Sequence, residues 1–569
     1  MPEDLKLVVD AEIEAALTRA VSQMCELDDP VQWLGEYVET LYKKGAFSQA
    51  QGADIALEIL IPKVLKRKDP TGSLRSTGSS FNLEAIANSI SVAMAYYQLR
   101  DYIYISFTEN NAIEWQILDQ RLLVSVKDLS IFRQLCGEIQ VFFINSSKVE
   151  NKGTETEDLV ELLAGTKQFD LENENVAKSL DIIEKETKWK LGFLYDHLPS
   201  DSKIQLDGYN YSEFYKVYNE LLEHSIYQRY YSLANNLSSV ITYSEDELVN
   251  ATESAFGIGK SLCRKILIDI AASSRSSFIW VPSKKKFLLF PFSFSLKDGL
   301  SGILKKFAKD HPNKFSSSVA VAIGNSLVER LSDYFKPFSN FRCLTEINLQ
   351  KYSSDLPDID LLAISYEPSL GFHIFVCEAK NNLPASWAKE HLKARGKDGY
   401  VEKALSQSKK INKFLRTKPG VDLIYSIIKK HFSHLDFERL FPTGFSAVYD
   451  FVIITSQNLG MFFPNAETSI INEDMFKHII DGSDGDVCYI QNFLRNMNET
   501  LDSCYDVKTV SIDTDHYQIE YEVAQLSKIL QIERTQYLSV GALEDLEHES
   551  LSTGGHFVDM LSDPRGGKG

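Results

Sequence analysis

Hydrophobic positions recur every three or four residues over the first hundred residues of the chain, a spacing typical of helices that bury one face. One such stripe consists of Ile13, Ala16, Leu17 and Ala20. Three short runs rich in β-branched and aromatic residues instead predict strands: Tyr102–Phe107, Leu122–Val126 and Glu138–Ile144. We therefore expect a helical and mixed N-terminal region over residues 1–150.

Helical spacing returns between Leu159 and Ala272, and strand-like runs flank three lysines within Ser277–Ser293. This pattern predicts a helical region with one β-hairpin over residues 151–315. The polar segment His311–Ser318 is expected to form the boundary to the next domain.

Helix and strand patterns alternate after that boundary. In chain order they are a helix, three strands, a helix and a strand: Val319–Phe335, Phe341–Gln350, Leu356–Ser365, Gly371–Lys380, Gly399–Leu415 and Ala447–Ser456. This order predicts an α/β domain with a central mixed sheet over residues 316–485. Residues 486–569 are expected to form an acidic C-terminal extension and tail, and the whole chain is expected to be a multidomain, α-rich protein.

The second and third of these strands carry charged residues at one end. A short turn centred on Ser369 predicts an antiparallel hairpin, and a symmetric hairpin places Asp360 opposite Glu378 and Asp358 opposite Lys380. Because side chains alternate along a strand, these four even-numbered residues share one face. Burying opposed carboxylates is costly unless a cation compensates, and carboxylate oxygens suit Mg²⁺ or Mn²⁺. A metal beside a lysine supplies what phosphodiester hydrolysis requires.

The residues Pro357-Asp358-Ile359-Asp360, followed by Glu378-Ala379-Lys380, resemble the motif of the PD-(D/E)XK nuclease superfamily. The resemblance covers about residues 318–482 and implies a restriction-endonuclease-like fold. It implies that Asp360, Glu378 and the backbone carbonyl of Ala379 bind Mg²⁺ or Mn²⁺. Lys380 is then the third catalytic residue, and Asp358 is an auxiliary acid.

The same resemblance implies roles for residues on two helices. Glu329 on the first helix is a metal ligand, with a solvated helix acid as the equal alternative. Gln407 on the second helix is an auxiliary residue near the site, and Lys409 and Lys410 contact nucleic acid unless they form an ordinary exposed face. One departure is Ile411, where subfamilies with a Gln on this helix can carry Tyr.

The net charge of −19 argues against a general polyanion binder, but the charge is uneven. Residues 380–430 contain 13 Lys and Arg against four Asp and Glu, whereas residues 460–569 contain seven against 20. This distribution indicates one anion-facing surface with acidic flanks. No apolar run is long enough to span a bilayer, and the acidic start does not resemble a signal peptide, so we expect a cytoplasmic protein without a membrane partner.

These patterns together predict a Mg²⁺-dependent deoxyribonuclease, an endonuclease acting in anti-phage defence or restriction by analogy with the family. Residues 1–315 are then expected to mediate homo-oligomer or partner-protein contacts. Two alternatives stay open. One is a non-catalytic interaction or assembly protein that retains the nuclease fold, and the other is a DNA-repair or RNA nuclease.

Overall fold

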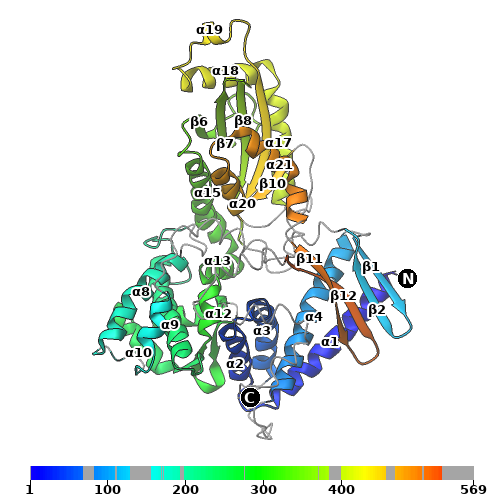
Figure 1. Cartoon of the computed structure of the whole chain (residues 1–569), viewed down its shortest axis with the longest axis vertical. Helices are drawn as coiled ribbons and strands as arrows, with labels where there is room; N and C mark the ends of the chain where they lie inside the picture. Colours follow the sequence, from blue (N-terminus) through cyan, green and yellow to red (C-terminus); the bar gives the residue numbers. More distant parts are fainter. Residues whose placement is uncertain are drawn as a thin grey trace.

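The structure is a computed structural model that describes residues 2–67, 82–108, 112–128, 156–167, 170, 172–191, 198–274, 276–369, 371–383, 399–456, 468–502 and 505–527. It is rich in helices and contains mixed sheets, in agreement with the expected α-rich character. Within these residues, no helix is sufficiently long and apolar to cross a bilayer. Figure 1 shows a narrow upper lobe standing on a broader base.

Four helices open the chain, as the hydrophobic spacing predicts: α1 (Pro2–Cys25), α2 (Pro30–Lys43), α3 (Phe47–Arg67) and α4 (Leu83–Thr108). The predicted strand Tyr102–Phe107 is wrong, because these residues form the last turns of α4. Tyr102, Ile103 and Ile105 are buried there. A helix that is buried on several sides has the same continuous run of apolar residues in its sequence as a buried strand. The predicted strand Glu138–Ile144 lies outside the described residues.

Residues 156–310 form a second helical part around a small three-stranded sheet. Its elements are α7 (Thr156–Leu163), α8 (Glu174–Leu191), α9 (Tyr211–Ala234), β3 (Ile241–Ser244), α10 (Glu245–Phe256), α11 (Lys260–Ser273), β4 (Phe278–Val281), η2 (Pro282–Lys284), β5 (Lys286–Leu289), α12 (Pro291–Leu296) and α13 (Gly299–Asp310). The predicted hairpin is confirmed, since β4 and β5 pair antiparallel from Phe278↔Leu289 to Val281↔Lys286.

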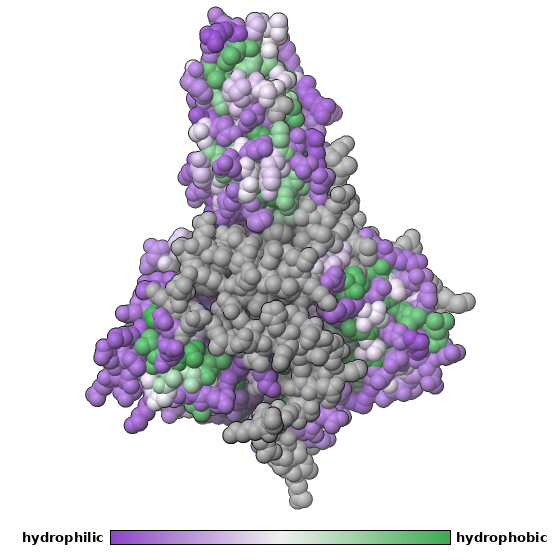
Figure 2. Space-filling view, in the orientation of Figure 1, coloured by the Kyte–Doolittle hydropathy of each residue, from purple (hydrophilic) through white to green (hydrophobic). Residues whose placement is uncertain are grey.

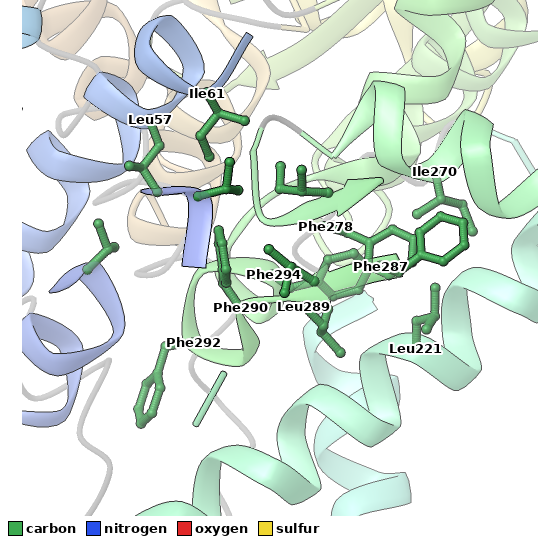
Figure 3. Close-up of a cluster of buried hydrophobic side chains, with 14 of the residues drawn as sticks. Leu57, Ile61, Leu221, Ile270, Phe278, Phe287, Leu289, Phe290, Phe292 and Phe294 are labelled. Carbon is green, nitrogen blue, oxygen red and sulfur yellow. The ribbon is translucent and has the colours of Figure 1, made fainter. Parts of the chain in front are cut away.

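One hydrophobic core joins this part to the first helices. Figure 3 shows Leu57 and Ile61 of α3 near a group of phenylalanines that leads through β5 and α12 toward Leu221 of α9. Phe278 and Phe287 stack with ring centroids 5.1 Å apart. The base is therefore held together by a continuous apolar interior.

The connection to the upper lobe is helical. α14 (Pro312–Lys314), η3 (Phe315–Val319) and α15 (Ala320–Tyr334) follow α13 almost without interruption. The segment His311–Ser318, expected to be a polar boundary, is thus largely helical backbone. The hydroxyl groups of Ser316 and Ser318 each donate to the carbonyl four residues back.

The upper lobe contains a five-stranded mixed sheet with the order β10-β9-β8-β7-β6. Its strands are β6 (Phe341–Ile347), β7 (Ile359–Glu367), β8 (Gly371–Lys380), β9 (Ala447–Thr455) and β10 (Ser469–Asn472). β6, β7 and β8 pair antiparallel, and β9 and β10 continue parallel to β8. The predicted helix, three strands, helix and strand are all present in the predicted order.

Helices cover both faces of this sheet. α15, α20 (Glu473–Gly482) and α21 (Val487–Asp502) pack on the face that carries Leu361 and Phe375. α17 (Tyr400–Leu415) and α18 (Lys418–His431) pack on the face that carries Leu362 and Ile374. α19 (Phe437–Leu440) lies at the upper tip of the lobe (Figure 1). The burial of both faces explains why β7 and β8 are apolar at successive positions.

A third sheet joins segments that are far apart in the sequence. β1 (Ile113–Leu118) and β2 (Arg121–Val126) pair with β12 (Gln518–Leu526) and β11 (Tyr505–Asp513) in the order β1-β2-β12-β11. β12 runs parallel to β2, and Arg121 of β2 forms an ion pair with Glu520 of β12. Residues 505–526, which the sequence presents as part of an acidic extension, therefore complete a sheet begun near residue 113 (Figure 1).

Candidate functional site

The pairing of β7 with β8 agrees with the predicted symmetric hairpin. The pairs run from Glu367↔Gly371 beside the turn to Leu361↔Cys377. The next step of the same register sets Asp360 opposite Glu378, on the face covered by α17 and α18. The register predicted from the sequence is thereby confirmed, and it brings the two acids together at the end of the hairpin away from the turn.

Two contacts fix these side chains. The Oδ2 atom of Asp360 accepts a hydrogen bond from the backbone N–H of Ala379 at 2.7 Å. The Nζ atom of Lys380 forms an ion pair with the Oε1 atom of Glu378, on the same face of β8 two residues away. Asp360 thus bonds the backbone between the other two charged residues.

Glu378 is a buried acid whose two carboxylate oxygens differ in their contacts. Only 4% of the residue is exposed, and its Oε2 atom has no hydrogen-bond partner among the described residues. Burial raises the pKa of Glu378, and the carboxylate of Asp360 raises it further, while the Lys380 ammonium opposes this rise. Burial likewise raises the pKa of Asp360. Burial of the two acids is therefore only partly compensated, by Lys380 at Glu378 and by Lys380 and the Ala379 N–H at Asp360.

The donor set fits a hard divalent cation. Mg²⁺ is commonly bound through one or two carboxylates while water completes its octahedron, and Asp360 with the unpartnered oxygen of Glu378 would match such a donor set. In the described part of the chain, no three His, Cys, Asp or Glu side chains converge closely enough to hold an ion by themselves. Water or substrate oxygens would complete the coordination.

A third acid, Glu346, was not identified from the sequence. It lies in β6 between Thr345, which pairs with Leu361, and Ile347, which pairs with Ile359, so the register sets it opposite Asp360. Burial raises the pKa of Glu346, with a further contribution from the carboxylate of Asp360. Glu346, Asp360 and Glu378 thus form a row across three neighbouring strands.

The backbone of Glu346 is unusual for a strand residue. Its φ is +54°, in the left-handed region that a residue with a Cβ adopts at a cost. Such outliers gather at functional sites, where the surrounding structure imposes them. Nothing in the sequence indicates this conformation, since neither Gly nor Asn stands at this position.

Asp358 takes a different place from the one predicted. β7 begins at Ile359, so Asp358 lies just before the strand and outside the paired residues of the hairpin. Its Oδ1 atom accepts the backbone N–H of Leu349 at 3.1 Å. Asp358 therefore fixes the loop that precedes the strand, while Lys380 pairs with Glu378 instead.

The structure does not bring Glu329 to these acids. Leu327 and Leu331 pack α15 against the sheet face that carries Leu361, which is opposite to the face of Asp360. Glu329 itself is exposed on this helix. The metal-ligand role inferred for it has no geometric support in this arrangement.

α17 does lie on the face of the acids, where its Ile411 packs against the sheet. Gln407 is half-buried on this helix, whereas Lys409 and Lys410 are exposed. The Nζ atom of Lys410 lies 3.4 Å from the backbone oxygen of Asp355, in the loop that leads to β7. The two lysines are thus available to a large ligand on this side of the lobe.

A cavity of about 540 Å³ lies in the base, between α2, α3 and the hairpin of β4 and β5, where Asp29, Trp280 and Lys284 line it.

Comparison of the chain with protein-family models, with curated proteins and with solved structures found no match. The resemblance to the PD-(D/E)XK superfamily therefore rests on the motif residues and on the order and register of the elements that carry them.

Proposed function

We propose that the upper lobe is a Mg²⁺-dependent nuclease with a restriction-endonuclease-like fold that hydrolyses phosphodiester bonds of DNA as an endonuclease. The observation that carries this proposal is the buried Glu378, set opposite Asp360 with one carboxylate oxygen unpartnered among the described residues. A buried acid is stable only with compensation, and Lys380 engages only its other oxygen.

In this proposal Asp360, Glu378 and the backbone carbonyl of Ala379 hold Mg²⁺ or Mn²⁺. When bound, the ion would supply an activated water and stabilise charge on the phosphate. Lys380 would then donate a hydrogen bond to the attacking water or to a phosphate oxygen. Asp360 keeps the backbone between these two residues in position through the N–H of Ala379.

Charge on the lobe supports a polyanionic substrate. The exposed lysines Lys409 and Lys410 stand on α17, on the same side of the sheet as the acids. The visible surface of the lobe is mostly hydrophilic, with smaller hydrophobic areas (Figure 2). Lysines that track a phosphate backbone supply affinity without sequence preference.

The test is a cleavage panel on the full chain. Plasmid, linear single-stranded DNA and RNA are incubated with and without Mg²⁺. We expect metal-dependent cleavage of DNA that is lost in Glu378→Ala and Lys380→Ala. Glu438→Gln changes an exposed acid on α19 and is the matched control that keeps activity. Activity without metal, or unchanged activity in Glu378→Ala, would contradict the proposal.

A second candidate is a non-catalytic assembly protein that retains the fold. The ion pair between Lys380 and Glu378 favours it, because this pair already neutralises much of the buried charge. Calorimetric titration separates the two candidates: the nuclease binds Mg²⁺ through Glu378, whereas the assembly protein shows no heat of Mg²⁺ binding and no cleavage of any substrate in the panel.

A further inference from the structure

An exposed aromatic ring stands in the loop between β6 and β7, at the end of the sheet where β8 finishes. This ring belongs to Tyr352, which is 40% exposed. β7 is antiparallel to both β6 and β8, so the end of β6, the start of β7 and the end of β8 lie together. The loop therefore adjoins the end of the sheet that carries Asp360 and Lys380.

Three contacts hold this ring in place. The backbone N–H of Tyr352 donates to the oxygen of Leu349 at 2.9 Å, and Leu349 is fully buried. The ring of Phe414 in α17 lies 5.0 Å from the Tyr352 ring, centroid to centroid, at an interplanar angle of 41°. Because Asp358 bonds the N–H of Leu349, the loop is also tied to the residue next to β7. The ring is thus a fixed platform and not a side chain on a free loop.

One lysine lies beside the ring, and two more lie on α17, the helix that carries Phe414. The Nζ atom of Lys351 lies 5.0 Å from the centroid of the Tyr352 ring. Lys410 approaches the same loop at the backbone of Asp355, and Lys413 is exposed one residue before Phe414. Asp355 is an exposed acid on this loop. Lys351, Lys410 and Lys413 outnumber the two acids of the loop, Asp355 and Asp358, which favours a negatively charged ligand beside the ring.

We propose that Tyr352 is a base-stacking residue that binds single-stranded DNA beside the acidic row. The inference rests on the proposed function and specifies its substrate as DNA with unpaired bases next to the cleaved phosphate. Bases of a duplex are stacked on one another and cannot use such a platform, whereas every unpaired base offers a π face. A base that stacks on the ring displaces the Lys351 ammonium toward the phosphate carried by the same nucleotide.

The chain supplies a matched control in Tyr425. This residue is 46% exposed, it stacks on Phe445 at 5.8 Å, and the Nζ atom of Lys429 lies 6.0 Å from its ring centroid. Phe445 in turn contacts Phe372 near the start of β8, so Tyr425 stands at the opposite end of the sheet. It has the same local chemistry as Tyr352 without the adjacent acids.

The experiment measures binding of the full chain by fluorescence anisotropy, with Ca²⁺ in place of Mg²⁺ so that cleavage does not interfere. The probes are a labelled oligothymidylate and a blunt duplex of equal length. We expect Tyr352→Ala to weaken oligothymidylate binding about tenfold and duplex binding less than about twofold. Tyr352→Leu, which keeps the apolar contact with Phe414, weakens it similarly, whereas Tyr352→Phe and Tyr425→Ala retain binding.

Three outcomes would overturn the inference: no binding of the oligothymidylate by the unchanged chain, equal losses on both probes, or an equal loss in Tyr425→Ala. Its failure is distinguishable from that of the proposed function. Binding that depends on Tyr352, without cleavage in Mg²⁺, would contradict the nuclease proposal and support the stacking site. Cleavage together with binding that does not depend on Tyr352 would contradict the stacking site and support the nuclease proposal.

Discussion

Asp360 in β7 accepts the backbone N–H of Ala379 in β8 at 2.7 Å, so the side chain of one strand bonds the other strand between Glu378 and Lys380. This single bond occupies the Oδ2 atom and aligns the two residues beside it. A change at Asp360 therefore alters both a ligand and the geometry of its neighbours, and the two effects need separate measurements.

Asp360→Asn separates them, because the amide oxygen still accepts the N–H of Ala379 while the charge is lost. We expect Asp360→Asn to unfold at nearly the same temperature as the unchanged chain and to lose more than about 100-fold in Mg²⁺-dependent cleavage. Asp360→Ala loses activity and stability together. Melting curves and DNA cleavage, measured on the same preparations, check both statements. Full activity in the Asn variant would remove Asp360 from the metal site.

Lys380 and Glu378 are expected to depend on each other for stability. The Glu378 side chain is 5% exposed and that of Lys380 is 21% exposed, so removal of the lysine leaves a carboxylate buried without its partner. Without divalent cations at neutral pH, Lys380→Ala should lower the free energy of unfolding by about 3 kcal/mol. The double variant with Glu378→Gln should recover most of this loss. Urea denaturation checks the cycle, and additive losses would show that the ion pair is not formed in solution.

Glu346 combines a strained backbone with a negative charge beside Asp360. Because its φ is +54°, Glu346→Gly should raise the free energy of unfolding by about 1 kcal/mol. The same substitution removes a negative charge beside Asp360, so it should also weaken Mg²⁺ binding and raise the Mg²⁺ concentration needed for half-maximal cleavage. Glu346→Gln should leave the free energy of unfolding without this gain, but it should change the Mg²⁺ requirement of cleavage in the same way as Glu346→Gly. A destabilised glycine variant in urea denaturation would contradict the strained conformation.

A buried acid in the base predicts a pH dependence of stability. Glu39 of α2 is 1% exposed and accepts the backbone N–H groups of Phe292 and Ser293, both at 3.0 Å. Burial raises the pKa of Glu39 to about 7, and the nearby Asp54 carboxylate adds to this.

The folded state therefore holds a proton at Glu39 that the unfolded state releases near its ordinary pKa of 4.5. The associated stability is complete below pH 4.5 and is lost as the pH rises to about 7, by up to about 3 kcal/mol. We expect Glu39→Gln to lose less stability than the unchanged chain between pH 5 and pH 7 (roughly the interval between the two pKa values). Melting temperatures of the two proteins that fall equally between pH 5 and pH 7 would refute this.

The hairpin could be predicted from the sequence because its register depends only on local features. A short turn and two strands buried on both faces leave one pairing that is symmetric about Ser369. The predicted strand at Tyr102–Phe107 failed because burial inside α4 requires the same aromatic and β-branched residues that strands prefer. Composition alone does not distinguish these two environments.

Other features depend on contacts between distant segments. Glu346 joins the acidic row only through the pairing of β6 with β7, and Asp358 stays outside the paired strands because β7 begins at Ile359. The pairing of β12 with β2 cannot be read from either strand, since each presents an ordinary alternating pattern. Long-range pairing therefore accounts for most of what sequence reasoning missed.

The sheet of β1, β2, β12 and β11 also constrains the order of events during synthesis. Arg121 and Glu520, which form an ion pair in this sheet, are 399 positions apart. At about 5–20 residues per second, a ribosome needs roughly 20–80 s to produce the second of them after the first. Throughout that time β2 presents an unpaired edge, while the five strands of the upper lobe are all made before β12. We infer that the upper lobe completes its sheet first and that the base closes last, with β2 exposed to other chains until β12 emerges.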